Sequence, residues 1–476
     1  MQQTDMDIVV IGAGPAGMLA AIGAAERGRR VLLLDRMPKP GLKLLATGGG
    51  RCNLTNVLPP NEFMARFGRF GRFMEPALRE LDNGGLLKFF ATLGVPAHCA
   101  DGFHYFPVAE SAAAVQETLF LYCGKLGVKS RFNCRVGRVL PEGRPGFPAP
   151  GPVARGERQT VGTNEPVSEQ HQARCCAKRV SASQSDVGCA DTARPGAGNP
   201  GLVLQVETDQ GTFTANRVIL AAGGRSYAGL GSDGSGFGLA AHLGHTVKPA
   251  HPALVPLIVR ETWVPSCAGT TFADAEVWID LPKKRGVRMC GPVLFTHRGV
   301  SGPAVLDLSG DVAELLEKMP EVPLRVRWQR AESAEEWTRR LAAWRREHGG
   351  KLLRNLLDEK LPASFATALA TACGAAETKA ANLTATQAAL LVEHLTELPL
   401  HVTATEGFGK AMVTRGGVAL KEIHPETLES RLVPGLYFAG EVVDLDGPCG
   451  GYNLQWAFSS GLLAGRSAAG AVCQTS

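Results

Sequence analysis

The first residues in the chain that could do chemistry are three glycines, Gly12, Gly14 and Gly17, in the string Gly12-Ala13-Gly14-Pro15-Ala16-Gly17. They follow a short β-branched run, residues 6–11, and open residues 15–28, whose small alanines suit a helix packed on a sheet. Glycines at this spacing permit a tight turn and let the backbone approach a pyrophosphate. The helix N-terminus adds unpaired N–H donors.

An acid lies where such a turn needs one. Asp35 ends the next apolar run, residues 31–34, which completes a strand–helix–strand unit. Its carboxylate can accept hydrogen bonds from both ribose hydroxyls of an adenosine, and it would repel a 2′-phosphate, which disfavours NADP. The unit therefore predicts a dinucleotide site. Its residues are Gly12, Gly14, Pro15, Ala16, Gly17 and Asp35.

Two later segments decide between FAD and NAD. Residues 218–224 read as a buried strand that ends in Ala222-Gly223-Gly224, and residues 436–441 as a strand that ends in Gly440-Glu441. Both resemble segments of flavoproteins of the glutathione-reductase type, in which the acid corresponding to Glu441 binds the ribityl chain. The predicted cofactor is therefore FAD, held by both ends of the chain.

Longer strings carry a more specific resemblance. The chain resembles the bacterial NAD(P)/FAD-dependent, aminoacetone-oxidase-like oxidoreductases of that superfamily. The first string is Lys43 with residues 47–56 (TGGGRCNLTN), and the second is residues 295–303 (FTHRGVSGP). The third is residues 412–418 (MVTRGGV). The fourth runs from Gly440-Glu441 through residues 450–456 (GGYNLQW) to Gly461.

This resemblance implies an α/β fold: a three-layer β/β/α FAD-binding Rossmann-like domain with an inserted β-barrel plus helical domain. The expected boundaries are 1–250 and 409–476 for the FAD domain and 251–408 for the insert, divided into a barrel at 251–330 and helices at 331–400. Helical spacing is also expected at 74–94 and 110–126, and a strand at 128–140.

The resemblance also implies further cofactor contacts. It places residues 49–53 beside the pyrophosphate and flavin ring, the backbone of Val136 at the adenine edge, and the N-terminus of the last helix at the flavin N1/C2 carbonyl region. The residues it adds to the site are Lys43, Thr47, Gly48, Gly49, Gly50, Arg51, Cys52, Asn53, Val136, Ala222, Gly223, Gly224, Gly440, Glu441, Asn453, Leu454 and Gln455.

Residues 141–200 differ from their surroundings. They are rich in Pro, Gly, Ser and mixed charge and contain no Leu, Ile, Met, Tyr or Trp. Such a segment buries too little apolar area to offset the entropy of ordering it. We expect a mostly disordered surface insertion, which departs from the family pattern.

Two side chains are candidates for catalysis. His297 lies in a Gly- and Pro-rich turn and could act as a general acid while the flavin delivers hydride; the alternative is a structural histidine that bonds loop backbone. Cys52 lies among the expected cofactor contacts and could be a redox thiol if Cys449 came near it; the alternative is a small buried side chain.

Composition limits the other possibilities. The net charge is +5 with the basic residues scattered, which weighs against nucleic acid as a partner. Twelve cysteines form no C-x-x-C pair and no zinc spacing, so no metal site is expected. No signal peptide and no apolar stretch of about 20 residues is present, so we expect a cytoplasmic protein that does not enter the membrane.

The sequence therefore favours an FAD-dependent oxidoreductase that acts on a small organic substrate, with hydride transfer through flavin N5 and NADH or NADPH as a transient electron donor. Three alternatives stay open: an amine or alcohol oxidase that uses oxygen, an RNA-modifying flavoprotein, and a flavin-binding protein without turnover. The substrate and the oligomeric state are not fixed by the sequence.

Overall fold

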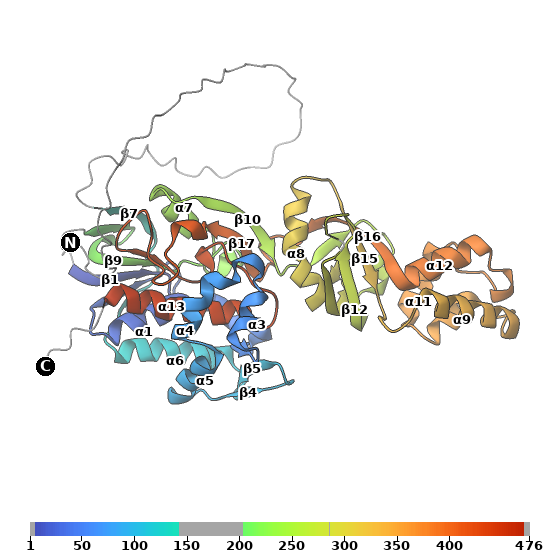
Figure 1. The fold of residues 1–476 in the computed structure, drawn as a ribbon, viewed down its shortest axis with the longest axis horizontal. Coiled ribbons are helices and arrows are strands. Elements are labelled where there is room, and N and C mark those ends of the chain that lie inside the picture. The colour runs from blue at the N-terminus through green and yellow to red at the C-terminus, as the bar shows by residue number, and fades with distance from the viewer. Residues whose placement is uncertain (1–4, 142–202, 285, 471–476) are drawn as a thin grey trace, which may run out of the picture. The chain divides into compact units, whose positions relative to one another are not determined.

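The structure is a computed structural model that describes residues 5–141, 203–284 and 286–470 (Figure 1). The insertion expected at 141–200 lies outside the described residues, apart from Pro141.

A seven-stranded sheet in the order β6-β2-β1-β9-β8-β7 forms the core, with β18 paired to β9. Strands β1 and β18 pair with β9 in parallel, and β2 and β6 continue the parallel sheet beyond β1. Strand β8 pairs with the beginning of β9 in antiparallel fashion, and β7 pairs with β8 in the same way. The parallel strands β1, β2 and β18 are buried and largely apolar, as strands covered on both faces must be, whereas the edge strand β6 is exposed. The strands are β1 (Asp5–Ile11), β2 (Val31–Leu34), β6 (Lys129–Arg131), β7 (Val136–Pro141), β8 (Leu204–Thr208), β9 (Gly211–Leu220) and β18 (Leu436–Phe438).

Helices α1 (Pro15–Ala25) and α13 (Tyr452–Ala469) lie side by side although they come from opposite ends of the chain (Figure 1). Glycines make this approach possible. A Cβ on Gly461 would stand 2.2 Å from the carbonyl oxygen of Ala16, and one on Gly465 would stand 2.1 Å from that of Ala20. Helix α6 (Ala112–Lys125) packs beside α1.

The remaining elements of this part include two small sheets, β3-β5-β4 and β10-β17, and short helices. They are α2 (Leu42–Leu45), η1 (Thr47–Gly50), β3 (Thr55–Asn56), α3 (Pro60–Ala65), η2 (Gly68–Met74), α4 (Glu75–Glu80), α5 (Asn83–Thr92), β4 (Ala97–Cys99), β5 (His104–Pro107), η3 (Ala228–Leu230), α7 (Ser235–His242), β10 (Val247–Ala253), β17 (Val413–Val418), η6 (Leu420–Glu422) and η7 (Gly440–Val442).

A closed antiparallel barrel in the order β11-β14-β13-β12-β15-β16 forms a second core. Rings of Phe272, Phe295, Trp328 and Phe365 pack against one another there, with centroids 4.9–6.5 Å apart. The strands are β11 (Leu257–Val259), β12 (Thr271–Ile279), β13 (Arg288–Phe295), β14 (Gly299–Ser301), β15 (Val322–Arg327) and β16 (Leu398–Thr405).

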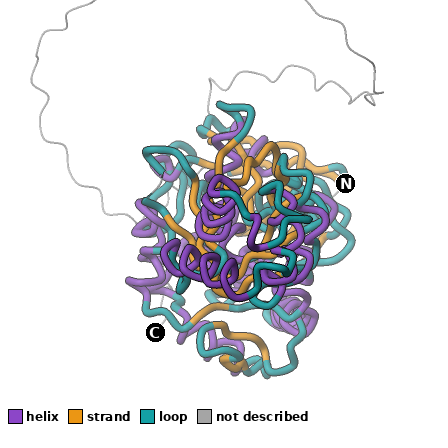
Figure 2. Tube along the Cα trace, turned by 90° about the vertical axis from the view of Figure 1, so that its right-hand side faces the viewer, coloured by secondary structure: helices purple, strands orange, loops and turns teal. Residues whose placement is uncertain are grey.

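The segment of the chain that forms the barrel strands also contains helices. Helix α8 (Pro303–Leu316) follows β14, and the segment between β15 and β16 folds into four helices that gather together (Figures 1 and 2). These are α9 (Ala334–Glu347), α10 (Leu353–Asp358), α11 (Ala363–Ala372) and α12 (Ala385–Glu397); η4 (Val264–Cys267) and η5 (Ala380–Asn382) are short turns beside them. None of the helices in the described ranges is both long and apolar enough to cross a lipid bilayer.

The expected fold class is confirmed: a parallel Rossmann-like sheet with helices and a separate barrel-and-helix part. The domain boundaries stay a prediction. The helical spacing expected at 74–94 is confirmed, and one local expectation, a single strand at 128–140, was wrong. Residues 128–140 form two strands, β6 and β7, because the chain leaves the parallel sheet at Asn133, which has a φ of 51°. Residues 74–94 form α4 and α5, separated at Leu81 and Asp82, whose carboxylate caps α5 by accepting from Gly85 N at 2.7 Å.

Candidate functional site

The three glycines of the loop after β1 lack a side chain for different structural reasons. Gly12 has a φ of 103°, and a Cβ there would stand 2.4 Å from the carbonyl oxygen of Ala221. A Cβ on Gly17 would stand 1.7 Å from the carbonyl oxygen of Gly12, so only glycine lets α1 lie against the turn. A Cβ on Gly14 would meet no protein atom within 4 Å. Gly14 therefore leaves open space on a cavity wall.

That cavity has a volume of about 380 Å³ and begins at the N-terminus of α1. Gly14 is the N-cap and offers no side chain to the first turn, and Pro15, at the first helical position, has no N–H. The remaining first-turn N–H groups and the helix dipole therefore stay available to an anion.

Asp35 stands at the tip of β2 on the same cavity. Its carboxylate accepts from the backbone N–H of Ala13 at 2.6 Å and from that of Met37 at 2.8 Å. Burial raises the pKa of this carboxyl above its ordinary value, although these two N–H donors and Arg36 act in the opposite direction. The carboxylate is thus held in place with lone pairs left for hydroxyl donors.

The next wall is the loop of residues 47–53, where Gly48, Gly49 and Gly50 have φ angles of 56°, 67° and 90°. A Cβ on Gly49 or Gly50 would meet nothing within 4 Å. Asn53 ties this loop to the last helix: in the amide orientation that satisfies its neighbours, it donates to Thr55 O at 3.0 Å and accepts from Gly451 N at 3.1 Å.

The N-terminus of α13 faces the same cavity. Its N-cap, Gly451, has a φ of 83° and no capping side chain, and Gly450, Asn453 and Leu454 beside it line the cavity. Asn453 fixes the approach to the helix, because its amide accepts from Gly447 N at 2.9 Å and donates to Gly447 O at 2.8 Å. Two helix N-termini, those of α1 and α13, therefore border one cavity.

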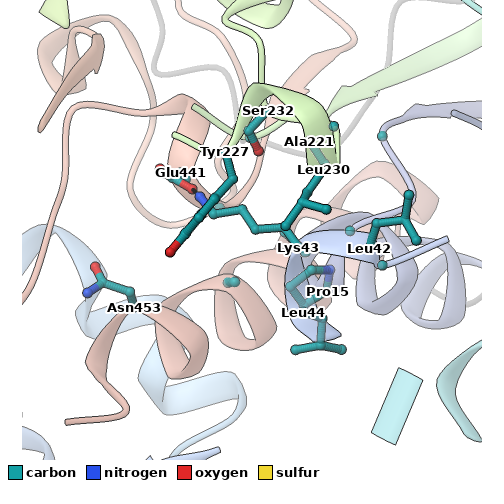
Figure 3. A pocket seen from close by; sticks show the side chains of 18 of the residues that line it. Pro15, Leu42, Lys43, Leu44, Ala221, Tyr227, Leu230, Ser232, Glu441 and Asn453 are labelled. Atoms are coloured by element: carbon teal, nitrogen blue, oxygen red, sulfur yellow. Dashed lines mark hydrogen bonds and ion pairs between the residues drawn. The ribbon is translucent and has the colours of Figure 1, made fainter. Parts of the chain in front are cut away.

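A polar network borders the cavity, and Figure 3 shows two of its members, Lys43 and Glu441. The Nζ of Lys43 contacts a carboxylate oxygen of Glu441 at 2.5 Å and the hydroxyl of Ser226 at 2.7 Å. Ser226 donates to the other Glu441 oxygen at 2.8 Å, and the backbone N–H of Thr414 donates to that oxygen at the same distance. The network joins α2, the loop after β9, β17 and η7.

Most of the residues expected at the site line this cavity. They are Gly12, Gly14, Pro15, Ala16, Asp35, Lys43, Thr47, Gly48, Gly49, Asn53, Val136, Ala222, Gly223, Gly440, Glu441, Asn453 and Leu454.

The other expected cofactor contacts lie next to the wall or behind it. Gly17 lies beneath the glycine turn, and Gly50 follows the residues of its loop that line the cavity. The guanidinium of Arg51 stands over the ring of Phe106, 4.5 Å from its centroid. Gly224 packs on Thr414, whose Oγ1 would be 2.5 Å from an added Cβ. Gln455 is buried and donates to Leu81 O at 3.0 Å.

The two catalytic candidates do not line the cavity. Cys52 is fully buried with a φ of 65°, and burial raises the pKa of its thiol to about 12, so it is held as a neutral thiol. Its backbone N–H donates to Thr47 O at 3.1 Å, which suits a structural part in the loop. His297 is exposed in the turn between β13 and β14.

Sequence reasoning did not find Ser226, Thr414 or Tyr227. Tyr227 lines the cavity and follows Ser226, in a loop that starts from Gly223-Gly224. The only local signal was the density of Gly and Ser over residues 223–236, because the contacts of Ser226 reach Lys43, 183 residues away, and Glu441, 215 residues away.

These residues fit the predicted cofactor. The open space at Gly14 and Gly49 and the uncapped N-terminus of α1 suit a pyrophosphate. The uncapped N-terminus of α13 suits an electron-rich ring carbonyl, and the anchored Asp35 at the tip of β2 suits a ribose.

Comparison with known proteins agrees with this geometry. Residues 6–146 and 174–467 match the HI0933-like protein Rossmann domain. The chain is 31% identical to the 3-dehydro-bile acid delta(4,6)-reductase of Clostridium scindens over 97% of this chain and 98% of that protein. It is 30% identical to the ribosomal RNA dihydrouridine synthase of Escherichia coli, over 95% and 96%.

Among solved structures, the 3-ketosteroid-delta4-(5alpha)-dehydrogenase of Rhodococcus jostii RHA1 is similar with a TM-score of 0.46 and 16% identity, over 99% of this chain and 98% of that one. The family match covers most of the chain. The chain therefore belongs to the HI0933-like family, which confirms the predicted class of FAD-dependent oxidoreductases with a Rossmann-type nucleotide-binding fold.

Proposed function

We propose that this enzyme reduces a carbon–carbon double bond conjugated with a carbonyl group in a small organic substrate, and that NADH or NADPH supplies the electrons. The observation that carries the proposal is the cavity onto which two uncapped helix N-termini and the acid of β2 converge. This convergence supports the proposal because such a cavity could accept both halves of FAD.

The names of the relatives support this reaction type. A 3-dehydro-bile acid with delta(4,6) unsaturation carries a double bond conjugated with its ketone. Dihydrouridine differs from uridine by two hydrogens across a double bond conjugated with a carbonyl. Relatives that act on such different molecules share addition of hydrogen to an activated double bond, so the proposal is made at that level.

The residues divide between the two halves of the cofactor. Gly12, Gly14 and Asp35 would hold the ADP half, and Asn53, Gly440, Glu441, Asn453 and Leu454 the flavin half. When bound, FAD supplies the hydride acceptor and donor of the reaction. The N-terminus of α13 would favour negative charge on the ring by roughly 0.3–1 kcal/mol or more when water is excluded.

The chain carries one dinucleotide fingerprint, at Gly12 to Gly17, which FAD would occupy. The use of NADH or NADPH as the electron donor is therefore a separate part of the proposal. A nicotinamide would then have to visit the cofactor and leave, rather than occupy a domain of its own. The test is anaerobic mixing of the purified yellow protein with NADH and NADPH, followed by addition of an enone or of oxygen. Fast bleaching with reoxidation by the enone supports the reductase. No bleaching by either nucleotide, with rapid reoxidation by oxygen after chemical reduction, would instead identify an oxidase.

An RNA substrate is the second candidate. One observation besides the dihydrouridine synthases favours it. Arg66, Arg69 and Arg72 are exposed around η2, and in the described part of the chain their guanidinium groups form no salt bridge or side-chain hydrogen bond. Arg69 stacks on the ring of Phe70, 4.5 Å from its centroid. Arginines interleaved with an exposed ring suit a phosphate backbone with unstacked bases.

Charge reversal separates the two candidates. The triple variant Arg66→Glu, Arg69→Glu, Arg72→Glu would lose salt-sensitive binding to ribosomal RNA if RNA is the substrate, but would keep reduction of a small enone. The matched control changes Arg339, Arg345 and Arg346 of α9, which are also exposed, to Glu. Equal or absent RNA binding by the wild type and both variants would remove the RNA candidate.

A further inference from the structure

We propose that Tyr227 is the catalytic acid of this enzyme, the group that protonates the substrate carbon next to its carbonyl. The inference rests on the proposed reduction of a conjugated double bond, which needs one proton besides the hydride. His297, the general acid considered from the sequence, does not line the cavity, and neither does Cys52, which was considered as a redox thiol.

The backbone at Tyr227 is held in an unfavourable conformation. Its φ and ψ are both 57°, in the left-handed region that a bulky side chain rarely adopts. The surroundings fix it there: its N–H donates to Phe408 O at 3.1 Å, and its carbonyl accepts from Leu230 N at 2.8 Å. Strain that the surroundings impose is concentrated at functional sites, because it aims a side chain that a relaxed loop would turn away.

The residue before it adds a second restraint. Ser226 is fully buried, and its hydroxyl lies between Lys43 and Glu441 at 2.7 and 2.8 Å. Its backbone N–H donates to the hydroxyl of Thr414 at 3.1 Å. The polar network around Ser226 therefore also fixes the backbone next to Tyr227.

The side chain extends into the cavity (Figure 3). In that view the phenol lies between Glu441 and Asn453, and both of these residues line the same cavity. Its hydroxyl makes no hydrogen bond to any residue that the structure describes. A half-buried hydroxyl that is aimed into a cavity without a protein partner is free to bond a ligand.

Other proton donors near this end of the cavity are already committed. Lys43 is paired with Glu441. Burial, and then the carboxylate of Asp307, raise the pKa of the Cys449 thiol well above its ordinary value, so that it holds its proton tightly. Tyr452 is buried between Phe63 and Phe67, with ring centroids 4.8 and 6.1 Å away. Tyr227 is the acid in the described cavity wall that combines a free hydroxyl with access.

The step balances as follows for an enone. FAD, when bound and reduced, would supply the hydride, with its two electrons, that the carbon farther from the carbonyl takes up. The O–H bond of Tyr227 breaks, its proton forms the new C–H bond on the carbon next to the carbonyl, and the product is the saturated ketone. The phenolate then takes a proton from solvent water.

The test compares Tyr227→Phe with Tyr122→Phe, which removes a hydroxyl that bonds Glu26 at 3.2 Å outside the cavity. We expect Tyr227→Phe to retain FAD and to be bleached by the nicotinamide at the wild-type rate. Its reoxidation by the enone should be about 100-fold slower or more, as for loss of a general acid. Reoxidation within threefold of the wild type would overturn the proposal.

A second readout does not depend on turnover. A tyrosine beside a flavin quenches its fluorescence by donating an electron from the phenol, so Tyr227→Phe and Tyr227→Leu should both brighten the bound FAD, whereas Tyr122→Phe, outside the cavity, should not. Bound FAD that stays equally dim in Tyr227→Leu would place the residue away from the flavin and overturn the role. If no enone reoxidises the wild type, the proposed function fails with the acid role, while the fluorescence still reports whether Tyr227 lies beside the ring.

Discussion

At the residue scale, Gly12 and Gly14 stand in one loop but are glycines for different reasons. Gly12 has a φ of 103° and meets the backbone of Ala221, so its lack of a side chain serves the fold. Gly14 has an ordinary φ of −74° and faces open space in the cavity, so its lack of a side chain leaves room for a ligand.

The matched variants Gly14→Ala and Gly12→Ala separate these two reasons. We expect Gly14→Ala to unfold at the wild-type temperature or slightly above without FAD, and to bind FAD at least about tenfold more weakly, a cost of about 1.4 kcal/mol. Gly12→Ala should destabilise the unliganded protein by about 2–4 kcal/mol. Thermal unfolding of the apoprotein and titration with FAD measure the two effects. Equal loss of stability in both variants would contradict this division.

We expect Asp35, as a proposed ligand of the FAD ribose, to make cofactor retention depend on pH. Burial raises the pKa of its carboxyl, so it takes up a proton at a higher pH than an exposed aspartate would. Ribose hydroxyls bond the ionised form better, so FAD affinity should fall as the pH falls through that raised pKa. In the unliganded protein the sign is opposite: the folded state holds the proton more tightly, so this group adds stability at low pH and loses it as the pH rises through the raised pKa.

Asp35→Asn tests this dependence. The neutral amide should weaken FAD binding at pH 7 by about 10- to 100-fold, as expected for loss of a hydrogen bond to a charged group. The affinity of the variant should then change little between pH 7 and acidic pH. The measurement is FAD titration of both apoproteins across that pH range; a wild-type curve that is equally flat would show that Asp35 does not bind the ribose in its ionised form.

At the element scale, the close approach of α1 and α13 brings the C-terminal helix onto the first one. Gly461→Ala or Gly465→Ala would place a methyl group about 2 Å from a carbonyl oxygen of α1, so the helices would have to move apart. We expect a loss of about 1–3 kcal/mol in the free energy of unfolding and weaker FAD retention, because α13 carries one wall of the cavity.

Gly124→Ala in α6 is the control for this pair. An added Cβ at Gly124 meets nothing within 4 Å, so this change should be neutral or stabilise the fold by up to about 1 kcal/mol. Denaturant unfolding followed by circular dichroism gives all three values. A Gly465→Ala protein as stable as Gly124→Ala would mean that the two helices tolerate a wider separation.

The elements that could be predicted from the sequence are those determined by residues close together in the chain. The strand, turn and helix around Gly12 and Asp35 lie within one contiguous stretch, so spacing alone indicated them. The network around Ser226 could not be found this way, because its members come from four separate elements and meet only when β9, β17 and η7 are assembled. Tyr227 was missed for the same reason, since neither its backbone strain nor its free hydroxyl leaves a pattern in the sequence.

At the scale of the whole molecule, the antiparallel pair β7–β8 bounds the segment that the structure does not describe. Pro141 and Leu204 are paired neighbours, so the strand ends that this segment joins lie next to each other. Replacing residues 142–203 with an Asn-Gly turn should therefore preserve the hairpin. We expect the same FAD content and a melting temperature within a few degrees of the wild type; loss of FAD from the shortened protein would assign the segment a part in the site.

The pairing of α1 with α13 also has a consequence for biosynthesis. A ribosome releases α1 early and α13 near the end, so the face of α1 that Gly461 and Gly465 later cover stays open during nearly all of translation. The nascent polypeptide can form the turn at Gly12, but it lacks Glu441 and the N-terminus of α13, and so cannot close around FAD. We therefore expect FAD to be captured only after α13 has been made, so a chain truncated before Tyr452 should be colourless.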